Sequence, residues 1–314
     1  MSLSIEQIAA VSYPAVLAEM RKAQNQWAEN AALRIMEKQG VIQRISLGPT
    51  IEVPLDYRPN PDTAVLAGDQ DVASLVKTEV ITSASYSVAQ ISVPVTWTKG
   101  DDAKNPTENQ KIALVKSLLE NGINSHDDLL EQLIFTTSSA GGDEWNGLSD
   151  LVSASGTGTV GGIDASVETW WKNYADTYTD ATDIEATFTT AFNKAAKGSG
   201  ATLQPKFMIS GVAPHVMYES GLQTLQRFGD SSEADGGFKV LKFKNCDYIF
   251  SQYGGTKVYF LNPKNYSIVV SKQYFRDKGN TNEVQGQNAF YFLLYSAGQA
   301  VVNNRSRLAV VDQA

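Results

Sequence analysis

The sequence predicts an α+β protein, and three observations carry this prediction. Apolar residues recur every three or four positions over 105–137, which indicates a long helix. They recur at every second position over 41–57 and 78–97, which indicates strands. At 314 residues, the chain is long enough for one large domain or two intertwined ones.

The composition is that of a globular chain with few charges. Hydrophobic residues make up 42% of the sequence and charged residues only 19%, which is below the usual quarter. With 26 basic and 34 acidic residues, the formal net charge is −8, which argues against a basic, phosphate-binding protein. One cysteine and two histidines exclude a disulfide framework and leave little material for a metal or triad site.

Neither a membrane span nor a secretion signal is expected. The longest apolar runs are about five residues, far short of a bilayer span. Residues 1–20 mix acidic and apolar residues and lack the basic start and apolar middle of a signal peptide. We therefore expect a soluble protein made in the cytosol.

The first predicted element is an amphipathic helix over 15–38, with Pro14 at its start and Gly40 after its end. Its apolar stripe is thin, so we expect an arm that packs on another surface.

The chain from 41 to 98 predicts a long β-hairpin. Its first strand, 41–57, is interrupted at Gly48-Pro49, and residues 58–77 have a loop composition. In the returning strand the apolar parity flips near Ala89-Gln90, which indicates a bulge or a change of neighbours. An arm from 41 to 57 would reach roughly 55 Å, too far for a hairpin to be covered by its own residues.

The helix over 105–137 is the clearest element. Asn105, Pro106 and Glu108 form a capped start, and an unbroken apolar stripe favours a single helix despite Gly122. The stripe contains Ile112, Val115, Leu119, Ile123, His126, Leu130 and Leu133.

In the second half of the chain, segments with the apolar spacing of a helix alternate with segments that have the spacing of a strand. Helices are predicted over 181–197, capped by Asp180, and over 214–228. Strands are predicted over 207–209, 238–250, 257–261, 266–275, 283–302 and 307–311. Residues 289–295 are apolar on both faces, which predicts a central strand in a covered sheet.

Candidate chemistry is sparse. Gly156, Gly158 and Gly161 match the dinucleotide fingerprint, but no convincing strand precedes them, so we interpret the segment as a flexible loop. His126 is expected to be packed or hydrogen-bonded, and His215 to cap a helix or lie in solvent. We predict no catalytic residue, no cofactor and no metal site, and therefore no enzyme.

Three further features have structural interpretations. Cys246 is expected to be a small buried hydrophobe. The pairs Asp101-Asp102 and Asp127-Asp128 are expected to be solvated or to start helices. Trp170-Trp171 is expected to anchor a core or an interface rather than to stack on nucleic acid.

One stretch and the order of the parts resemble a known family. The sequence Gly161-Gly-Ile-Asp-Ala-Ser-Val-Glu-Thr-Trp-Trp-Lys-Asn173 follows the long helix and a glycine-bearing loop, Gly141–Leu151. The segment 298–307 resembles a closing strand. In this order the chain resembles, over essentially its whole length, the major capsid proteins of tailed bacteriophages, the Hong Kong 97-type fold.

The resemblance implies a domain plan. Residues 1–40 would be the N-terminal arm and 41–98 the extended hairpin, or E-loop. Residues 99–149 and 263–300 would form the peripheral domain with its spine helix, and 150–262 and 301–314 the axial domain. Contacts with neighbouring subunits are then expected at Trp27, Arg58, Asp62, Val65, Leu66, Val72, Leu75 and Lys77.

The resemblance also implies partners and a location. The chain would assemble with itself into the hexamers and pentamers of an icosahedral shell, in the host bacterial cytoplasm, and would reside in the virion capsid. Because the arm begins at once, we expect a separate scaffolding protein, together with a portal and a decoration protein. Packaged double-stranded DNA would be held by confinement, and no membrane is involved.

Three alternatives remain at this point. The first is an encapsulin-type nanocompartment shell with the same fold. The second is an enzyme that uses the glycine loop as a nucleotide site, and the third is a secreted adhesin, which the missing signal peptide disfavours.

Overall fold

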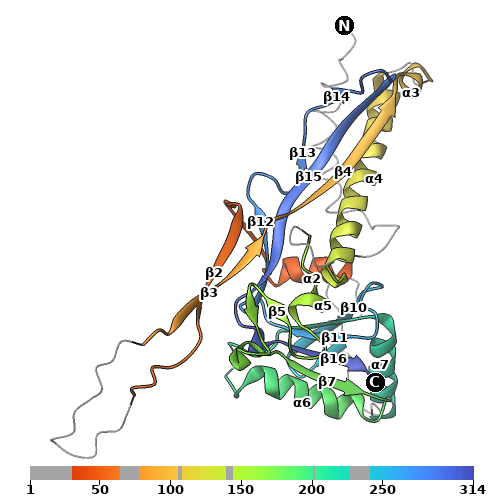
Figure 1. Ribbon diagram of the computed structural model, residues 1–314. Coiled ribbons are helices and arrows are strands. Elements are labelled where there is room, and N and C mark those ends of the chain that lie inside the picture. The colour runs from red at the N-terminus through yellow and green to blue at the C-terminus, as the bar shows by residue number, and fades with distance from the viewer. Residues whose placement is uncertain (1–29, 64–77, 105–107, 139–143, 201, 226–240) are drawn as a thin grey trace, which may run out of the picture.

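Two six-stranded sheets, a long helix and a projecting hairpin organise the chain (Figure 1). The structure is a computed structural model that describes residues 30–63, 78–104, 108–138, 144–200, 202–225 and 241–314. Its mixture of helices and strands confirms the predicted α+β class. None of the described helices is both long and apolar enough to cross a membrane.

The first sheet is built around β15 (Ala289–Val302), the longest strand that the structure describes. Its strand order is β1-β12-β15-β13, and β4 and β14 also pair with β15. The other strands are β1 (Ile42–Ile45), β4 (Ala89–Thr98), β12 (Tyr266–Ser271), β13 (Asp277–Lys278) and β14 (Asn282–Glu283). The predicted central position of 289–295 is therefore confirmed.

The predicted covering of both faces of 289–295 is wrong for this chain. Phe292 and Leu294 are fully buried beneath a helix, whereas Leu293, which points to the opposite face, is 39% exposed. Among the described residues, helical cover lies on one face of this strand only.

That helix is α4 (Glu108–Phe135), which runs beside β4 and β15 (Figure 1). The prediction of a single helix is confirmed over these residues, while the caps assigned to Asn105 and Pro106 lie outside the described residues. Gly122 does not break α4: a Cβ there would lie only 2.6 Å from Val95 Cγ2, so glycine allows the helix to approach the strand closely. A short helix, α3 (Lys99–Lys104), connects β4 to this region.

The second sheet has the order β7-β16-β11-β8-β10-β9. Its strands are β7 (Tyr174–Tyr178), β8 (Phe207–Ser210), β9 (Leu241–Phe243), β10 (Cys246–Phe250), β11 (Val258–Leu261) and β16 (Ala309–Gln313). Helices α6 (Ile184–Ala196) and α7 (Val212–Leu225) cover one face, where Phe188 and Tyr218 meet Phe260. Tyr259 and Leu261 point to the other face and join the main core, so this sheet is buried on both sides.

Several predicted boundaries in this half need correction. The single strand predicted over 238–250 is a hairpin of β9 and β10, which turns at Lys244 with a left-handed φ of 52°. Helix α6 begins at Ile184, and Asp180 instead accepts hydrogen bonds from the N–H groups of Thr182 and Asp183 in the turn before it. The closing segment is not one strand: β15 ends at Val302 and a 3₁₀ turn, η2 (Arg305–Arg307), leads into β16.

The hairpin itself is β2 (Thr50–Asp56) paired with β3 (Ile81–Ser87). The predicted hairpin over 41–98 is therefore wrong at both ends, because β1 pairs with β12 and β4 pairs with β15. The parity flip near Ala89 marks the change of neighbours between β3 and β4. Gly48-Pro49 also marks a change of neighbours, because β1 before it pairs with β12 and β2 after it pairs with β3.

Helix α2 (Ala31–Lys38) is the described part of the helix predicted over 15–38. Over these residues its apolar face packs within the same chain, because Leu33 and Met36 are buried in the main core. The Glu131 carboxylate of α4 accepts a hydrogen bond from the Leu33 N–H at 3.4 Å and one from the Ser251 hydroxyl at 2.5 Å. One carboxylate thus ties α2 and α4 to the segment after β10.

Short elements fill the space between the sheets. They are α5 (Leu148–Leu151), β5 (Thr159–Val160), β6 (Ile163–Asp164) and the 3₁₀ turn η1 (Thr169–Trp171).

Candidate assembly surface

The β2–β3 hairpin has one covered face and one exposed face. Ile51, Leu55, Ala84 and Tyr86 alternate along the two strands and belong to the main core. The opposite face is mostly polar, and its two apolar residues, Pro54 and Ile81, are both exposed, Ile81 to 69%. Strands β2 and β3 project away from the body of the molecule (Figure 1).

The covered face rests on the segment that contains β5 and β6. The Ser85 N–H donates to the Gly161 carbonyl at 3.0 Å. A Cβ on Gly161 would lie 2.7 Å from the Ala84 Cβ, and its φ of +61° favours glycine. The first glycine of the Gly161–Asn173 stretch is therefore required by the close approach of the hairpin.

Tyr86 connects the hairpin to the end of β15. Its hydroxyl donates to the Val302 carbonyl at 3.2 Å, and burial raises its pKa to about 12. The hydroxyl therefore stays protonated and remains a donor at ordinary pH.

Arg305 lies close to Tyr86 and is fully buried. Its guanidinium donates to three backbone carbonyls: Leu151 at 2.9 Å, Gly158 at 3.1 Å and Thr157 at 2.8 Å. Desolvation lowers its pKa to about 10, so it remains charged at neutral pH.

This arrangement bears directly on the glycine loop. A nucleotide site needs backbone N–H groups that point at a phosphate, between a strand and a helix. Here the loop follows helix α5, leads into β5, and turns two of its carbonyl oxygens toward a buried cation. The geometry agrees with the interpretation of these glycines as a structural loop.

Just beyond β2 and β3, hydrogen bonds join the two sides of the hairpin. We call this part of the hairpin, residues 57–62 and 78–79, the neck. The Tyr57 ring lies 5.2 Å from the Trp170 ring, and its hydroxyl donates to the Glu79 carbonyl. Arg58 Nε donates to the same carbonyl at 3.0 Å, and Asp62 accepts from the Thr78 hydroxyl at 3.3 Å.

Two of the predicted contact residues, Arg58 and Asp62, are thus brought together at the neck, where they bond within the hairpin. The others lie outside the described residues and stay predictions; they are Trp27, Val65, Leu66, Val72, Leu75 and Lys77.

The paired tryptophans have separate tasks. Trp171 is buried and its indole N–H donates to the Val160 carbonyl at 3.1 Å, while Trp170 contacts the hairpin neck. The expectation that they anchor a core is confirmed for Trp171.

Both histidines are buried inside the protein. His126 is buried, with Nε2 2.8 Å from the Ser296 hydroxyl and Nδ1 3.2 Å from Asp127, so the expectation of a packed, hydrogen-bonded side chain is confirmed. The expectation for His215 is wrong: it is only 5% exposed, between the rings of Tyr248 and Phe250.

Cys246 and the acidic pairs are structural. The Cys246 thiol is fully buried and burial raises its pKa to about 12, which confirms an unreactive hydrophobe. Asp127 is not simply solvated, because Arg276 pairs with it at 2.9 Å, and Asp128 accepts from the Tyr253 hydroxyl. Asp101 accepts from the Thr98 N–H at the start of α3, as a helix-start acid does.

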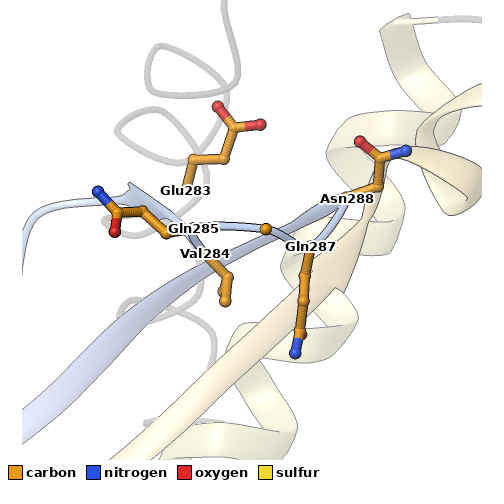
Figure 2. A pocket seen from close by; sticks show the side chains of 6 residues that line it. Glu283, Val284, Gln285, Gln287 and Asn288 are labelled. Carbon is orange, nitrogen blue, oxygen red and sulfur yellow. The ribbon is translucent and has the colours of Figure 1, made fainter.

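A hollow of about 450 Å³ lies at the turn between β14 and β15. Figure 2 shows that its walls are six consecutive residues of that turn, Glu283–Asn288, whose side chains spread in different directions. Polar groups from different elements do not converge there, as a small-molecule site would require. In the described part of the chain, no group of acidic, histidine or cysteine side chains could hold a metal ion.

Solved structures show what this architecture is. A capsid chain of cyanophage A-1(L) matches with a TM-score of 0.65 at 14% identity, covering 93% of this chain and 96% of that one. The chain has the Hong Kong 97-type capsid fold. No family model matches the sequence, and no curated protein matches it either.

Other proteins with the capsid fold match nearly as well. The capsid of a native GTA particle gives a TM-score of 0.60 at 10% identity, with 93% of each chain covered. The SrpI encapsulin of Synechococcus elongatus PCC 7942 gives 0.55 at 11% identity, with 95% and 94% covered. Phage capsids and an encapsulin therefore share this fold with the chain.

Several apolar residues are exposed on the described surface, and the sequence patterns do not single them out. The largest on the described surface include Ile81, Val212, Val216, Phe250, Tyr274 and Leu293. Val212 and Val216 are four residues apart in α7, a spacing that places both on one helix face and was visible in the sequence.

Proposed function

We propose that the chain is the major capsid protein of a tailed bacteriophage, a structural protein whose copies form an icosahedral shell around double-stranded DNA. The observation that carries the proposal is the capsid fold itself, which aligns with a phage capsid chain over 93% of this sequence. A structural role agrees with the histidines and the cysteine, which are all engaged in packing.

The hairpin is the part that we assign to contacts between subunits, as the E-loop. In its described strands, one face is covered by the same chain, through Ile51, Leu55 and Tyr86. The exposed face carries Ile81 among polar residues, and a neighbouring subunit would cover it. The proposed E-loop therefore consists of β2, β3 and the segment between them, and it is shorter than the predicted range 41–98.

The rest of the domain plan follows the two sheets. The first sheet with α4 would be the peripheral domain, and it takes in β1 and β4 as well as 99–149 and 263–300. The second sheet would be the axial domain, and residues 1–40 the N-terminal arm. Copies would form hexamers and pentamers, with a scaffolding protein, a portal and a decoration protein as partners, in a virion capsid assembled in bacterial cytoplasm.

The second candidate is an encapsulin-type nanocompartment shell, which the likeness to SrpI favours at a TM-score of 0.55. The contents of the particle separate the two: a phage head encloses DNA and a nanocompartment encloses a cargo protein. Nucleic acid and protein contents of particles purified from the native source distinguish them.

The direct test is assembly of the full chain. We expect closed shells by negative-stain electron microscopy and a fast-sedimenting species, either alone or with a co-expressed scaffolding protein. A chain that remains a compact monomer at every salt concentration and with the scaffold present would overturn the proposal.

A further inference from the structure

Four cationic residues lie in the last turn of α6 or against it. Lys244, from the turn between β9 and β10, reaches Asn193 Oδ1 at 3.2 Å. Arg307, from η2, donates to the Ala196 carbonyl at 2.7 Å. Lys197 ends the helix and donates to the Ser306 hydroxyl at 2.6 Å. We call Lys194, Lys197, Lys244 and Arg307 the α6 cationic cluster.

In the part of the chain that the structure describes, this cluster has no carboxylate partner. None of its four members forms an ion pair with an acidic group among the described residues. The acidic residue of α6, Glu185, lies in its first turn, at the opposite end of the helix. Burial and the neighbouring Arg307 both lower the pKa of Lys197. The concentration of positive charge stands out in a chain whose net charge is −8.

Stabilisation of the helix end accounts for only part of the cluster. Cations at a helix C-terminus are favourable, and Arg307 already bonds the Ala196 carbonyl. Lys197 adopts a left-handed φ of 48°, at a position where glycine is favoured and Gly198 follows directly. Lys194, Lys197 and Lys244 are exposed. Three exposed lysines exceed what one helix end needs.

We infer that the α6 cationic cluster binds the phosphate backbone of double-stranded DNA. Lysine and arginine neutralise phosphates without reading bases, which suits a protein that must hold any sequence. The cluster ends a helix that runs along the outer side of the second sheet (Figure 1), and a rigid duplex contacts such an exposed surface without a groove. The inference rests on the proposed phage function. It adds a defined contact between protein and DNA to the confinement of DNA that the resemblance implies.

The salt dependence of binding measures this contact. The slope of log affinity against log salt is about −0.9 per neutralised phosphate on duplex DNA. The variant is Lys194→Gln, Lys197→Gln and Lys244→Gln together, with Arg307 kept because it bonds the helix end. If all three lysines contact phosphates, the slope becomes shallower by about 2.7. The probe is a short duplex of mixed sequence, followed by fluorescence anisotropy with the purified full chain.

A matched control removes the same charge elsewhere. Lys38→Gln, Lys104→Gln and Lys272→Gln change three exposed lysines outside the cluster, so any effect of net charge alone is equal in both variants. We expect the control to keep the wild-type slope. Equal slopes for the wild type and the cluster variant, or equal losses in the two variants, would overturn the inference.

Three further measurements distinguish the possible outcomes. A polyglutamate peptide that binds the cluster more tightly than a duplex of equal charge would also overturn the inference, because the ligand would then be an acidic protein segment. Thermal melting of each variant shows whether the subunit is folded. Sedimentation of shells formed by the wild-type chain tests the proposed function separately from DNA binding.

Discussion

Arg305 is the residue on which the centre of the molecule depends most clearly. It is a fully buried cation whose partners are the backbone carbonyls of Leu151, Thr157 and Gly158. The Thr157 and Gly158 carbonyls belong to the loop that leads into β5, the Leu151 carbonyl lies at the end of α5, and Tyr86 of the hairpin lies close to Arg305. A neutral side chain of similar length would remove the donor from the buried Leu151 carbonyl and from the half-buried Thr157 carbonyl, whereas the Gly158 carbonyl would still accept from the Ala165 N–H at 3.2 Å.

Arg305→Met is therefore expected to lower the free energy of unfolding by about 3 kcal/mol, on the scale of a few unsatisfied buried groups. Urea unfolding followed by circular dichroism measures it. Arg44→Met, an exposed arginine stacked on Phe275, serves as control and should cost about 0.5 kcal/mol or less. An equal loss in both variants would contradict this account.

His215 makes stability depend on pH. Burial lowers its pKa below the ordinary 6.5, against a smaller opposing effect of Glu219. Between the folded and unfolded pKa values the unfolded chain binds more protons, so stability falls as pH drops through 6.5. In His215→Phe this contribution should vanish, and the midpoint of urea unfolding should fall less between pH 7 and pH 5. Identical pH profiles for the two proteins would show that His215 is not responsible.

At the scale of elements, α2 is held by a carboxylate from another helix. Glu131 accepts from the Leu33 N–H in the first turn of α2 and from Ser251. Glu131→Ala should loosen α2, and amide hydrogen exchange over 31–38 should speed up at least tenfold. Glu131→Gln retains an acceptor oxygen and should restore most of the protection. Protection that is unchanged in the alanine variant would mean that apolar packing alone docks the helix.

The hairpin gives the second prediction at this scale. Replacing 64–77 with a short Gly-Ser turn should shift the thermal midpoint of the subunit by only a few degrees. The reason is that each doubling of loop length changes the free energy of loop closure by only about 0.6 kcal/mol. Shell assembly should be lost, since every copy would lack the same contact. A Gly-Ser segment of the native length is the control for the side chains. A variant that melts outright, or one that still forms stable shells, would exclude this role.

The sequence predicted where helices and strands lie better than it predicted which strands pair with each other. The parity flip at Ala89 correctly indicated a change of neighbours, yet the sequence did not show that β4 leaves for β15. Period and capping are local properties, whereas strand pairing is set by residues two hundred positions away. The same limit applies to Arg305, because its carbonyl partners are identified only by the fold. The α6 cationic cluster joins three separate segments and left no local pattern.

At the scale of the whole molecule, Ile81 tests whether the exposed face of the hairpin meets another subunit. Ile81→Glu should leave the thermal midpoint of the subunit unchanged, because the side chain is 69% exposed. A buried carboxylate at a subunit contact should strongly reduce shell formation by sedimentation. Ile81→Thr, which adds no charge, should assemble well. Normal assembly of the glutamate variant would place Ile81 outside any contact.

The length of β15 has a mechanical consequence. The strand runs from the far end of the first sheet to Val302 and continues through η2 into β16 of the second sheet. All ten residues of β4 pair with it side by side. A pull along this axis loads those pairs together in shear rather than opening them one after another. The molecule should therefore resist a pull along this direction more strongly than a pull that separates β4 from β15 one pair at a time.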